Sequence, residues 1–467
     1  MTVQSTIHWE HHPQNPFNWP RWKKWMSMLT ACWVTFVVGL NATSITTAAD
    51  AISSEFHLAN GIFEYNFFAV TAWNAAAAFV PLATLPLMET YGMKFGFLAA
   101  YGLFTLFLIP QALAHNFATL VVCRAIAGAF GGTLQNCADG IASNLFLHHR
   151  ERVFPLTLYT FTLLFGVTMG PVLGAIAEPL GWRWVFWIEL IIYGASAPVV
   201  LFCMKETRGP LLRMKFMPEE ASPEGSDDSG EALETFKETI ARSAVLLTTE
   251  PTITAFTLWS AFAFGLVFIS TQSIPLVFSD TYGWPSYTAG VVQSAIGIGQ
   301  VIGLLACTLQ NRVYTRSASY NPESPGIPIP EYILHLSIPS TAIALAGGLF
   351  MYGWAIYQAH WIVLAVALAL IGYASMVIVT AVSIYITDSY AGYAASAIAA
   401  VAFGENIFAA FLPLAAKPMY VRLGYQWASS LLAFVALALT LAPLVLLWKG
   451  RIIRAKSVAI KKMSHSH

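Results

Sequence analysis

Long apolar segments separated by short polar ones run through almost the whole chain of 467 residues. Crossing the hydrocarbon core of a bilayer takes about 20 predominantly apolar residues in a helix. Twelve segments have that length, at 25–48, 62–87, 95–114, 117–143, 153–177, 182–203, 251–278, 287–310, 333–357, 360–386, 392–416 and 425–448. The hydrophobic pattern therefore predicts twelve transmembrane helices.

One long polar segment interrupts this pattern and leaves six apolar segments on either side. Residues 204–250 are rich in Glu, Asp, Ser, Pro and Gly, a composition typical of a solvated linker. We therefore expect an all-α membrane protein with two pseudo-symmetric six-helix bundles around a central cavity. Its expected parts are a cytoplasmic N-terminal segment (1–24), an N-terminal bundle (25–203), an acidic cytoplasmic linker (204–250), a C-terminal bundle (251–448) and a basic cytoplasmic tail (449–467).

Composition and charge agree with a membrane location. Hydrophobic residues make up 57% of the chain and charged residues 10%, whereas about 25% of the residues of a soluble domain are charged. If the N-terminus is cytoplasmic, 20 of the 24 lysines and arginines fall in cytoplasmic segments. This bias predicts that both termini are cytoplasmic. The formal net charge of zero gives no support for a nucleic-acid surface.

The cysteines do not indicate a metal site or a disulfide framework. All five lie in apolar segments and lack the spacing of metal ligands. We expect no cofactor and no metal. The sequence leads us to expect a multi-pass protein of the plasma membrane that works as a monomer in the lipid bilayer.

Glycine recurs every four residues in the apolar stretch 165–174. Gly166, Gly170 and Gly174 stay on one slowly drifting helix face at 3.6 residues per turn. A face without side chains lets a neighbouring helix approach to backbone contact. Pro171 removes an amide donor near the middle of the helix and predicts a bend there. By itself, this pattern indicates a packing face.

A charge inside a span is costly, and a functional role is the first hypothesis for an ionisable residue there. The candidates that lie well within predicted spans are Arg124, Asp139, Glu189 and Glu405. A carboxyl group that alternately meets the cytoplasm and the exterior can load and release a proton, so Glu405 is a candidate for proton coupling or cation recognition. Static roles are the alternatives. Arg124 would then bind carbonyl groups, Asp139 and Glu189 would reach water at the membrane surfaces, and Glu405 would contact Arg124 or Asn406.

Arg124 and Asp139 belong to one stripe on the fourth predicted helix. The stripe also contains Gly128, Gly131 and Gln135, at steps of three or four residues that return to the same face. We expect this small or polar face to line the cavity. Because Arg124 and Asp139 are about 22 Å apart along the axis, one lies deep in the pathway and the other near its cytoplasmic mouth.

Further polar and aromatic side chains within the spans are expected to line the cavity. Amides supply hydrogen-bonding groups and tryptophan supplies aromatic surface for an organic substrate. The candidates are Asn41, Trp73, Asn74, Gln135, Gln272, Gln293, Gln300 and Asn406. Helix packing or lipid contact is the alternative for any single aromatic residue. The basic cluster of His148, His149, Arg150 and Arg152 fits a cytoplasmic loop that contacts anionic lipid.

Several short motifs are spread over nearly the whole chain: Asn15-Pro-Phe-Asn-Trp19, Arg124-Ala-Ile-Ala-Gly128, the stretch from Gly166 to Gly174, Gly181-Trp-Arg-Trp-Val-Phe-Trp187, Pro330-Glu-Tyr332, Asp388-Ser-Tyr390 and Leu423-Gly-Tyr-Gln-Trp427. Together they resemble the fungal twelve-span drug:proton antiporters of the major facilitator superfamily. The resemblance implies proton-coupled export of a drug or a fungal secondary metabolite. It also identifies the glycine stretch with that family's antiporter motif and implies a gating role for Gly166, Gly170, Pro171 and Gly174. We therefore expect the glycine face to pack against a helix of the opposite bundle and to bend at Pro171 as the cavity changes sides.

The chain departs from this family pattern at several charged positions. Thr90 and Met93 stand where the family places arginines in the loop after the second span. Asn144 replaces an acid near the end of the fourth span, and Glu405 stands where relatives commonly have arginine. The charged gating loop of the family is therefore incomplete here.

The sequence lacks the motifs that characterise other functional classes. The chain has no phosphate-binding loop of an ATPase, no His-Glu-x-x-His or Gly-x-Ser-x-Gly motif of a hydrolase, and no repeated filter element of a channel. We therefore predict a secondary transporter and not an enzyme, with a small organic substrate and protons as partners. Uptake by proton symport or facilitated diffusion, and a sensor that binds without transport, remain the alternatives.

Overall fold

The computed structural model describes residues 8–58, 65–217, 242–321, 326–390 and 393–456, and these ranges contain helices and no strand. The long helices are α1 (Arg21–Thr43), α3 (Phe68–Tyr91), α4 (Met93–Ala112), α5 (Phe117–Leu145), α6 (His149–Ala177), α7 (Arg183–Cys203), α10 (Pro251–Tyr282), α12 (Ser294–Arg316), α15 (Trp361–Ser389) and α16 (Ala394–Lys456). Shorter helices are α2 (Ala49–Glu55), α8 (Gly209–Phe216), α11 (Ser286–Val292), α13 (Leu334–Pro339) and α14 (Ala346–Ala355).

Eleven helical stretches in the described ranges are long and apolar enough to cross a membrane. One of them lies within α16, whose 63 residues would extend about 95 Å as a straight helix, against about 30 Å for the hydrocarbon core. Gly424 interrupts α16 with φ 76° and ψ 159°, a conformation available essentially to glycine alone. The two arms that meet at Gly424 correspond to the last two predicted helices. The predicted all-α fold is confirmed.

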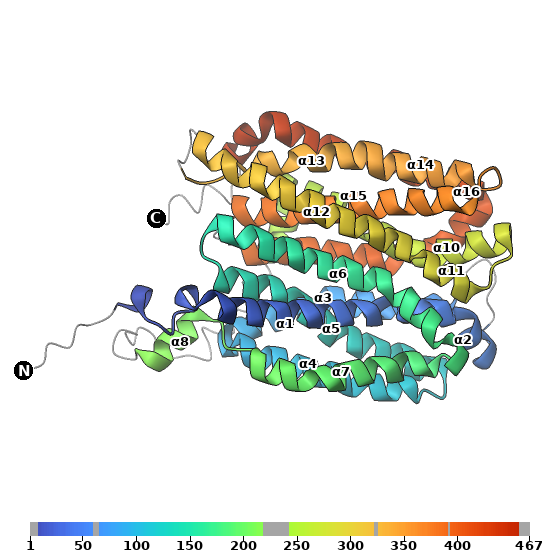
Figure 1. Cartoon of the computed structure of the whole chain (residues 1–467), viewed down its shortest axis with the longest axis horizontal. Coiled ribbons are helices and arrows are strands. Elements are labelled where there is room, and N and C mark those ends of the chain that lie inside the picture. The colour runs from blue at the N-terminus through green and yellow to red at the C-terminus, as the bar shows by residue number, and fades with distance from the viewer. Residues whose placement is uncertain (1–7, 59–64, 218–241, 322–325, 391–392, 457–467) are drawn as a thin grey trace, which may run out of the picture.

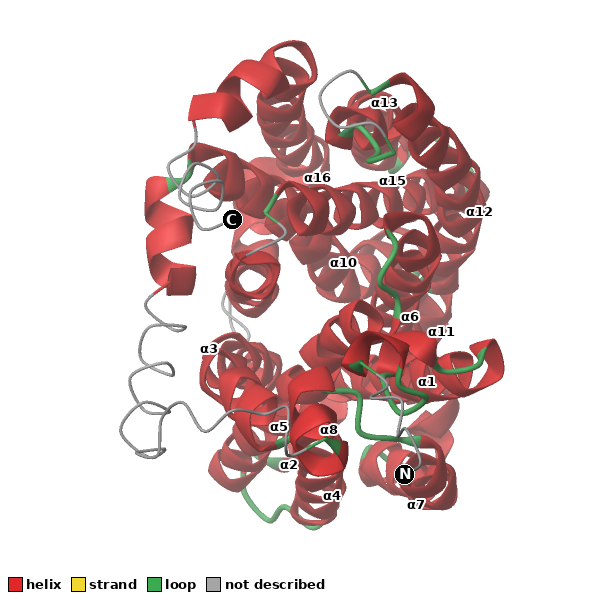
Figure 2. Ribbon diagram, turned by 90° about the vertical axis from the view of Figure 1, so that its left-hand side faces the viewer, coloured by secondary structure: helices red, strands yellow, loops and turns green. Residues whose placement is uncertain are grey.

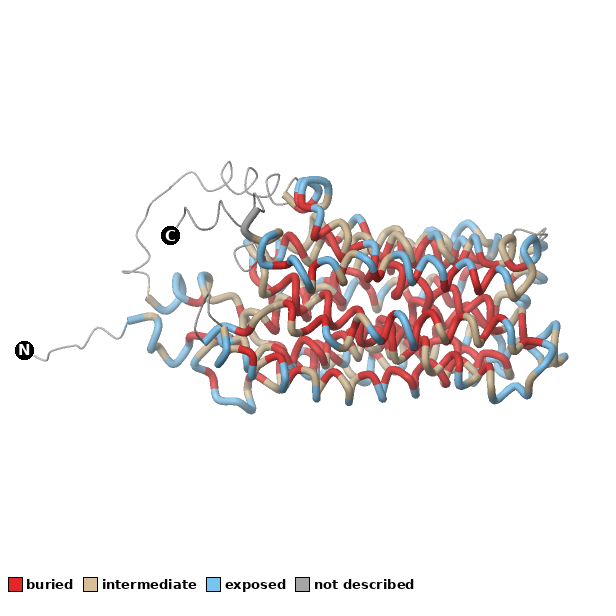
Figure 3. The backbone as a smooth tube through the Cα atoms, turned by 90° about the horizontal axis from the view of Figure 1, so that it is seen from above, coloured by how far each residue is buried: buried red, intermediate tan, exposed pale blue. Residues whose placement is uncertain are grey.

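The helices gather in two bundles that lie side by side. In Figure 1, α1 to α7 occupy the lower part and α10 to α16 the upper part, with α6 at the boundary, and Figure 2 shows the same division from another side. One buried apolar cluster comes mainly from residues between Trp19 and Leu212, and a second mainly from residues between Leu246 and Leu446. Buried backbone runs along the whole interior (Figure 3). Each bundle therefore has its own core.

The glycine face of α6 packs against α1, which belongs to the same bundle. A Cβ atom added to Gly166 would lie 2.3 Å from Phe36 O, and one added to Gly174 would lie 2.3 Å from Ser44 O. At Gly170 the added atom would lie 2.1 Å from Thr43 Oγ1. The prediction that this face meets a helix of the opposite bundle is wrong. The glycines instead allow backbone contact inside the N-terminal bundle.

A different face of α6 meets the opposite bundle. A Cβ atom added to Gly290 of α11 would lie 3.2 Å from Pro171 O, and one added to Gly297 of α12 would lie 2.5 Å from Met169 Cε. Helix α6 continues as a single α-helix through Pro171. It is therefore held by α1 on its glycine face and contacts α11 and α12 on another.

Substitution of Gly170 tests this close packing. Gly170→Leu is expected to destabilise the folded protein by about 1–3 kcal/mol or more, because the new side chain would force α1 away from α6. The melting temperature and the size-exclusion profile in detergent measure the effect. Gly194→Leu in α7 is the matched control, since an added Cβ atom there meets nothing within 4 Å. Equal melting temperatures for the two variants would contradict the proposed packing role.

Candidate functional site

The charged side chain of Arg124 is fully buried between α5, α1 and α3. Its guanidinium donates to Asn41 O at 2.6 Å, to Ala42 O at 2.9 Å and to Ala69 O at 3.3 Å. Two of these carbonyls lie in the last turn of α1, where carbonyl groups lack intrahelical partners. Arg124 therefore makes the carbonyl contacts that were the static alternative for it.

Asn41 joins Arg124 to Glu189 of α7. Its side-chain oxygen accepts from Arg124 Nη1 at 3.3 Å and from Trp73 Nε1 at 3.0 Å, and its amide nitrogen donates to Glu189 Oε2 at 2.6 Å. Ser44 Oγ donates to the other carboxylate oxygen of Glu189 at 2.7 Å. We call Arg124, Asn41, Ser44, Trp73 and Glu189 the buried charge network.

This network corrects three sequence-based interpretations. Glu189 is fully buried, so the interfacial hydration expected for it is wrong. Asn41 and Trp73 bind within the core of the N-terminal bundle instead of lining the cavities that the structure shows. A buried charge must be compensated within the protein, and here hydrogen bonds satisfy both charged groups while the Asn41 side chain links one to the other.

The stripe on α5 faces a cavity only in part. A Cβ atom added to Gly128 would lie 2.1 Å from Trp73 O, and one added to Gly131 would lie 2.9 Å from the Trp73 ring. These glycines, like Arg124, are therefore covered by helix packing. Gln135 and Asp139, further along the stripe, do line a cavity.

Asp139 and Glu405 line one small cavity from opposite bundles. This inner cavity has a volume of about 30 Å³, and its wall includes Gln135, Asn136, Tyr159 and Asn406. Asp139 on α5 is 5% exposed, and its Oδ1 atom is buried without a hydrogen-bond donor. Glu405 on α16 is 7% exposed and accepts a hydrogen bond from Ser260 Oγ of α10.

Neither static partner expected for Glu405 is present. Arg124 binds the carbonyl groups of α1 and α3, and Asn406 Nδ2 donates to Ala402 O at 2.8 Å. The hydroxyl group of Ser260 takes their place. Sequence reasoning did not identify Ser260, because a serine in an apolar helix carries no signal of its own.

A larger cavity adjoins the inner one at the end of the molecule where α8 lies, on the left in Figure 1. This outer cavity has a volume of about 360 Å³ and shares Asn136, Asp139 and Ile398 with the inner cavity. Its wall also contains Glu89, Met93, Asn144, Arg152, Arg208 and Arg242. The outer cavity therefore leads from this end of the molecule to Asp139.

Two acidic residues organise the loop after α3, where the sequence lacks the arginines of the family pattern. Glu206 accepts from the backbone amides of Met93 and Lys94, the first residues of α4, at 3.2 and 3.0 Å. Glu89 pairs with Arg208 at 3.5 Å. Residues at 206–208 thus hold the start of α4, as a carboxylate at a helix N-terminus does generally.

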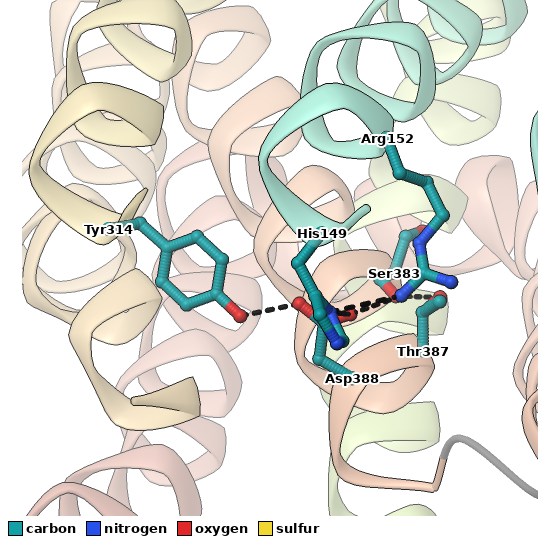
Figure 4. A network of polar contacts seen from close by, with 6 residues as sticks. All are labelled: His149, Arg152, Tyr314, Ser383, Thr387 and Asp388. Atoms are coloured by element: carbon teal, nitrogen blue, oxygen red, sulfur yellow. Dashed lines mark hydrogen bonds and ion pairs between the residues drawn. The ribbon is translucent and has the colours of Figure 1, made fainter. Parts of the chain in front are cut away.

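An ion-pair network joins the two bundles at this same end (Figure 4). Asp388, at the end of α15, has a side chain that is 4% exposed. Its Oδ1 atom lies 2.8 Å from His149 Nδ1 and 2.5 Å from Arg152 Nη2, both on the first turn of α6. Its Oδ2 atom accepts a hydrogen bond from Tyr314 of α12. We call these four residues the interbundle latch.

The latch changes the interpretation of the basic cluster before α6. His149 and Arg152 point to Asp388 instead of lipid, whereas His148 and Arg150 are exposed. Sequence reasoning missed the latch, although Asp388 lies just after the predicted span 360–386 and Arg152 just before the predicted span 153–177. Nothing in the sequence indicated that the two helix ends are adjacent.

The remaining amide candidates serve different purposes. Gln300 of α12 donates to Thr168 Oγ1 of α6 at 2.8 Å and so links the bundles. Gln293 donates to Ser270 Oγ at 2.7 Å within the C-terminal bundle, and Asn74 donates to Val70 O on its own helix. Gln272 lines a third cavity, of about 140 Å³, at the opposite end of the molecule.

Comparison with known proteins places the chain in context. A family model described as the Major Facilitator Superfamily matches residues 31–328. The MFS transporter cpaT of Aspergillus oryzae is 32% identical over 461 residues, which cover 95% of this chain and 90% of cpaT. The efflux pump radE of Floropilus chiversii is 30% identical over 456 residues, covering 95% of this chain and 83% of radE.

A solved structure shares the fold. The crystal structure of the human organic anion transporter MFSD10 (TETRAN) superposes with a TM-score of 0.65 and covers 91% of this chain and 100% of the other. The two sequences are 14% identical, so this likeness concerns the fold alone.

A double-mutant cycle tests the buried charge network. Arg124→Met and Glu189→Gln are each expected to destabilise the protein by about 3–5 kcal/mol, because each leaves one buried charge without its counterpart. The double variant should lose less than the sum of the two, since both charges are then gone. Melting temperatures in detergent measure the cycle. The exposed pair Arg183→Met and Glu55→Gln is the control, with an expected coupling below about 1 kcal/mol. Additive losses at Arg124 and Glu189 would show that their charges are independent.

Removal of the Asp388 charge tests the latch. Asp388→Asn is expected to loosen the contact between α6 and α12, because Arg152 loses its buried counter-charge. Spin labels on Arg150→Cys and Val313→Cys, with the native cysteines replaced, report the separation of these helices as a distance distribution. We expect the distribution to broaden towards longer distances. Asp280→Asn, which removes an acid bonded to Tyr425 at the other end, is the control. An unchanged distribution in Asp388→Asn would mean that the latch does not hold the bundles.

Proposed function

Because the chain belongs to the Major Facilitator Superfamily and is therefore a membrane transporter, we propose that it exports a small organic compound in exchange for protons. The observation that carries this proposal is the pair of carboxyl groups, Asp139 and Glu405, that line the inner cavity from opposite bundles. Ionisable groups inside a membrane protein are costly and typically belong to an ion or substrate pathway. The proposed exporter uses these two groups as its proton-binding site.

The connected cavities support a path from one membrane face to this site. The outer cavity opens at the end that carries Arg152, Arg208 and Arg242, an excess of basic residues typical of a cytoplasmic face. A cytosolic compound would reach Asp139 through this cavity. The plasma membrane and cytoplasmic termini are part of the same proposal.

The contacts between the bundles support alternating access. The latch, Gln300 with Thr168, and Asn311 with Thr157 hold α6 against α12 and α15. On the other side of the molecule, Thr71 of α3 donates to Ala410 O of α16. Rocking of one bundle against the other would break one set of contacts at a time. The buried charge network would keep the N-terminal bundle rigid during this motion.

Relatives support the direction of transport. The relative from Floropilus chiversii is named an efflux pump, and this chain covers 83% of its length. Export is therefore the direction that we propose, with uptake by proton symport as the competing outcome of the test.

Glu405→Gln tests the proposed coupling. The assay follows the neutral dye Nile red in de-energised yeast cells that express the protein, after an inward proton gradient is imposed. Proton-driven export should fall at least about tenfold, because glutamine has the shape of glutamate but binds no proton in this range. Glu55→Gln, a carboxyl at the opposite end that pairs with Arg183, is the control and should export normally.

Three outcomes of this assay contradict the proposal. Full gradient-dependent export by Glu405→Gln would remove Glu405 from the coupling step. Dye accumulation driven by the proton gradient would support symport, and dye binding without flux would support a sensor.

A further inference from the structure

The wall of the inner cavity contains two carboxyl groups and, among the residues that the structure describes, no lysine or arginine. Among the described residues, no lysine or arginine forms an ion pair with Asp139 or Glu405, whereas Glu89, Asp388 and Glu331 each have one. A carboxylate withdrawn from water needs a cation or several hydrogen-bond donors. We infer that the ammonium group of the substrate supplies this charge, so that the transported compound is an organic amine. This inference rests on the proposed export function and specifies its substrate.

Asp139 is the clearest sign of an unfilled hydrogen-bonding position. Its side chain is 5% exposed, and its Oδ1 atom accepts no hydrogen bond although it is buried. The same side chain lines both cavities. A buried acceptor without a donor is rare in native proteins and calls for a specific explanation. A ligand that brings N–H donors into the cavity provides one.

Glu405 and its neighbours supply the remaining acceptors. Its carboxylate receives one hydrogen bond, from Ser260, which leaves it further acceptor capacity. A primary ammonium has three N–H donors. Asp139 and Glu405 accept two of them, and the side-chain oxygen of Gln135 or Asn406 in the same wall is suited to the third. The rings of Tyr159 and Phe264 add faces for cation–π contact.

An organic cation fits these residues better than a multivalent metal ion. The residues that the structure describes contain no group of three or more His, Cys, Asp or Glu that could hold a metal. Two carboxylates flanked by amides and aromatic rings are instead typical of an ammonium site.

The outer cavity has room for the rest of the molecule. Its volume of about 360 Å³ lies within the range of about 300–1,000 Å³ found for small-molecule sites. Leu82, Leu85 and Ile398 give it apolar surface next to Asp139. An amine with an aromatic body would therefore place its ammonium in the inner cavity and its ring in the outer one.

The basic residues of the outer cavity have partners of their own, although Arg152 also acts electrostatically on Asp139 from a distance. Arg152 binds Asp388, Arg208 pairs with Glu89, and Arg242 lies over the Tyr393 ring at 5.1 Å. The charged or titratable groups that line the two cavities besides Asp139 and Glu405 are Glu89, Cys137, Arg152, Tyr159, Arg208, Arg242 and Tyr393. Among the described residues, Glu89 has an ion-pair partner in Arg208, whereas Asp139 and Glu405 form no ion pair.

Protons and the amine compete for this pair. Each carboxyl that takes up a proton loses its negative charge and with it the attraction for the ammonium. Because Asp139 lies on α5 and Glu405 on α16, a bound ammonium also bridges the two bundles. Release of the amine upon protonation therefore frees the bundles to move relative to each other.

Binding of three matched indole compounds tests the substrate class. The purified full-length protein in lipid nanodiscs is titrated with tritiated tryptamine, which is a cation, and with the neutral tryptophol and the anion indole-3-acetate as competitors. We expect tryptamine to bind at least tenfold more tightly than either competitor, and to bind more weakly as the pH is lowered. Asp139→Asn and Glu405→Gln should each weaken tryptamine binding at least tenfold and reduce its pH dependence, and the double variant should lose the pH dependence that the two carboxyls cause. Glu55→Gln should bind like the unmodified protein.

The opposite results overturn the inference. These are equal or tighter binding of tryptophol or indole-3-acetate, absence of tryptamine binding, or unchanged tryptamine binding in both carboxyl variants that keep a normal size-exclusion profile. If tryptamine fails to bind while Nile red export stays coupled to protons, the substrate class is wrong and the antiport proposal stands. If tryptamine binds as expected but is not exported from the same yeast cells when the proton gradient is imposed, the antiport proposal fails and the amine site remains.

Discussion

The burial of one positive charge, Arg124, constrains much of the N-terminal bundle. Its side chain is fully shielded from solvent, so its guanidinium must find acceptors in the protein. The last turn of α1 offers two of them, and Asn41 passes the interaction on to the carboxylate of Glu189. Three helices come together around this charge. The end of α1 lies against the glycine face of α6 and is hydrogen-bonded to Glu189 of α7. The folded N-terminal bundle depends on satisfying this charge.

The two bundles treat their buried charges differently, and the difference separates structure from function. Arg124 and Glu189 are joined through hydrogen bonds inside one bundle, so their charges are compensated whichever way the bundles move. Asp139 and Glu405 line the inner cavity from opposite bundles, and neither forms an ion pair in the described part of the chain. A compensated charge stabilises a fixed arrangement, whereas an uncompensated one at a moving boundary responds to what enters the cavity. The second pair is therefore where transport and proton binding can be linked.

The sequence was sufficient for the fold because length and hydrophobicity determine membrane spans directly. It could not show which faces of the helices meet. The spacing of Gly166, Gly170 and Gly174 correctly indicated a packing face, but spacing does not identify the partner, which is α1. Arg124 and Asp139 were recognisable as charges inside a span, yet only the packing of Gly128 and Gly131 against Trp73 separates a core residue from a cavity residue. The latch between Asp388 and Arg152 joins residues more than 200 positions apart, and no local pattern encodes such a contact.

The break at Gly424 has a mechanical consequence. Gly424 is the single non-helical residue between the two arms of α16, so the two arms are closely coupled and one cannot move far without the other. The first arm carries Glu405, and the second ends beside Glu331, which pairs with Arg454 in front of α13. A displacement of the first arm would therefore also move the second arm, and this movement would change the contact between Glu331 and Arg454. Binding at Glu405 within the membrane would thereby be transmitted along the two arms of α16 to a contact at the surface of the protein.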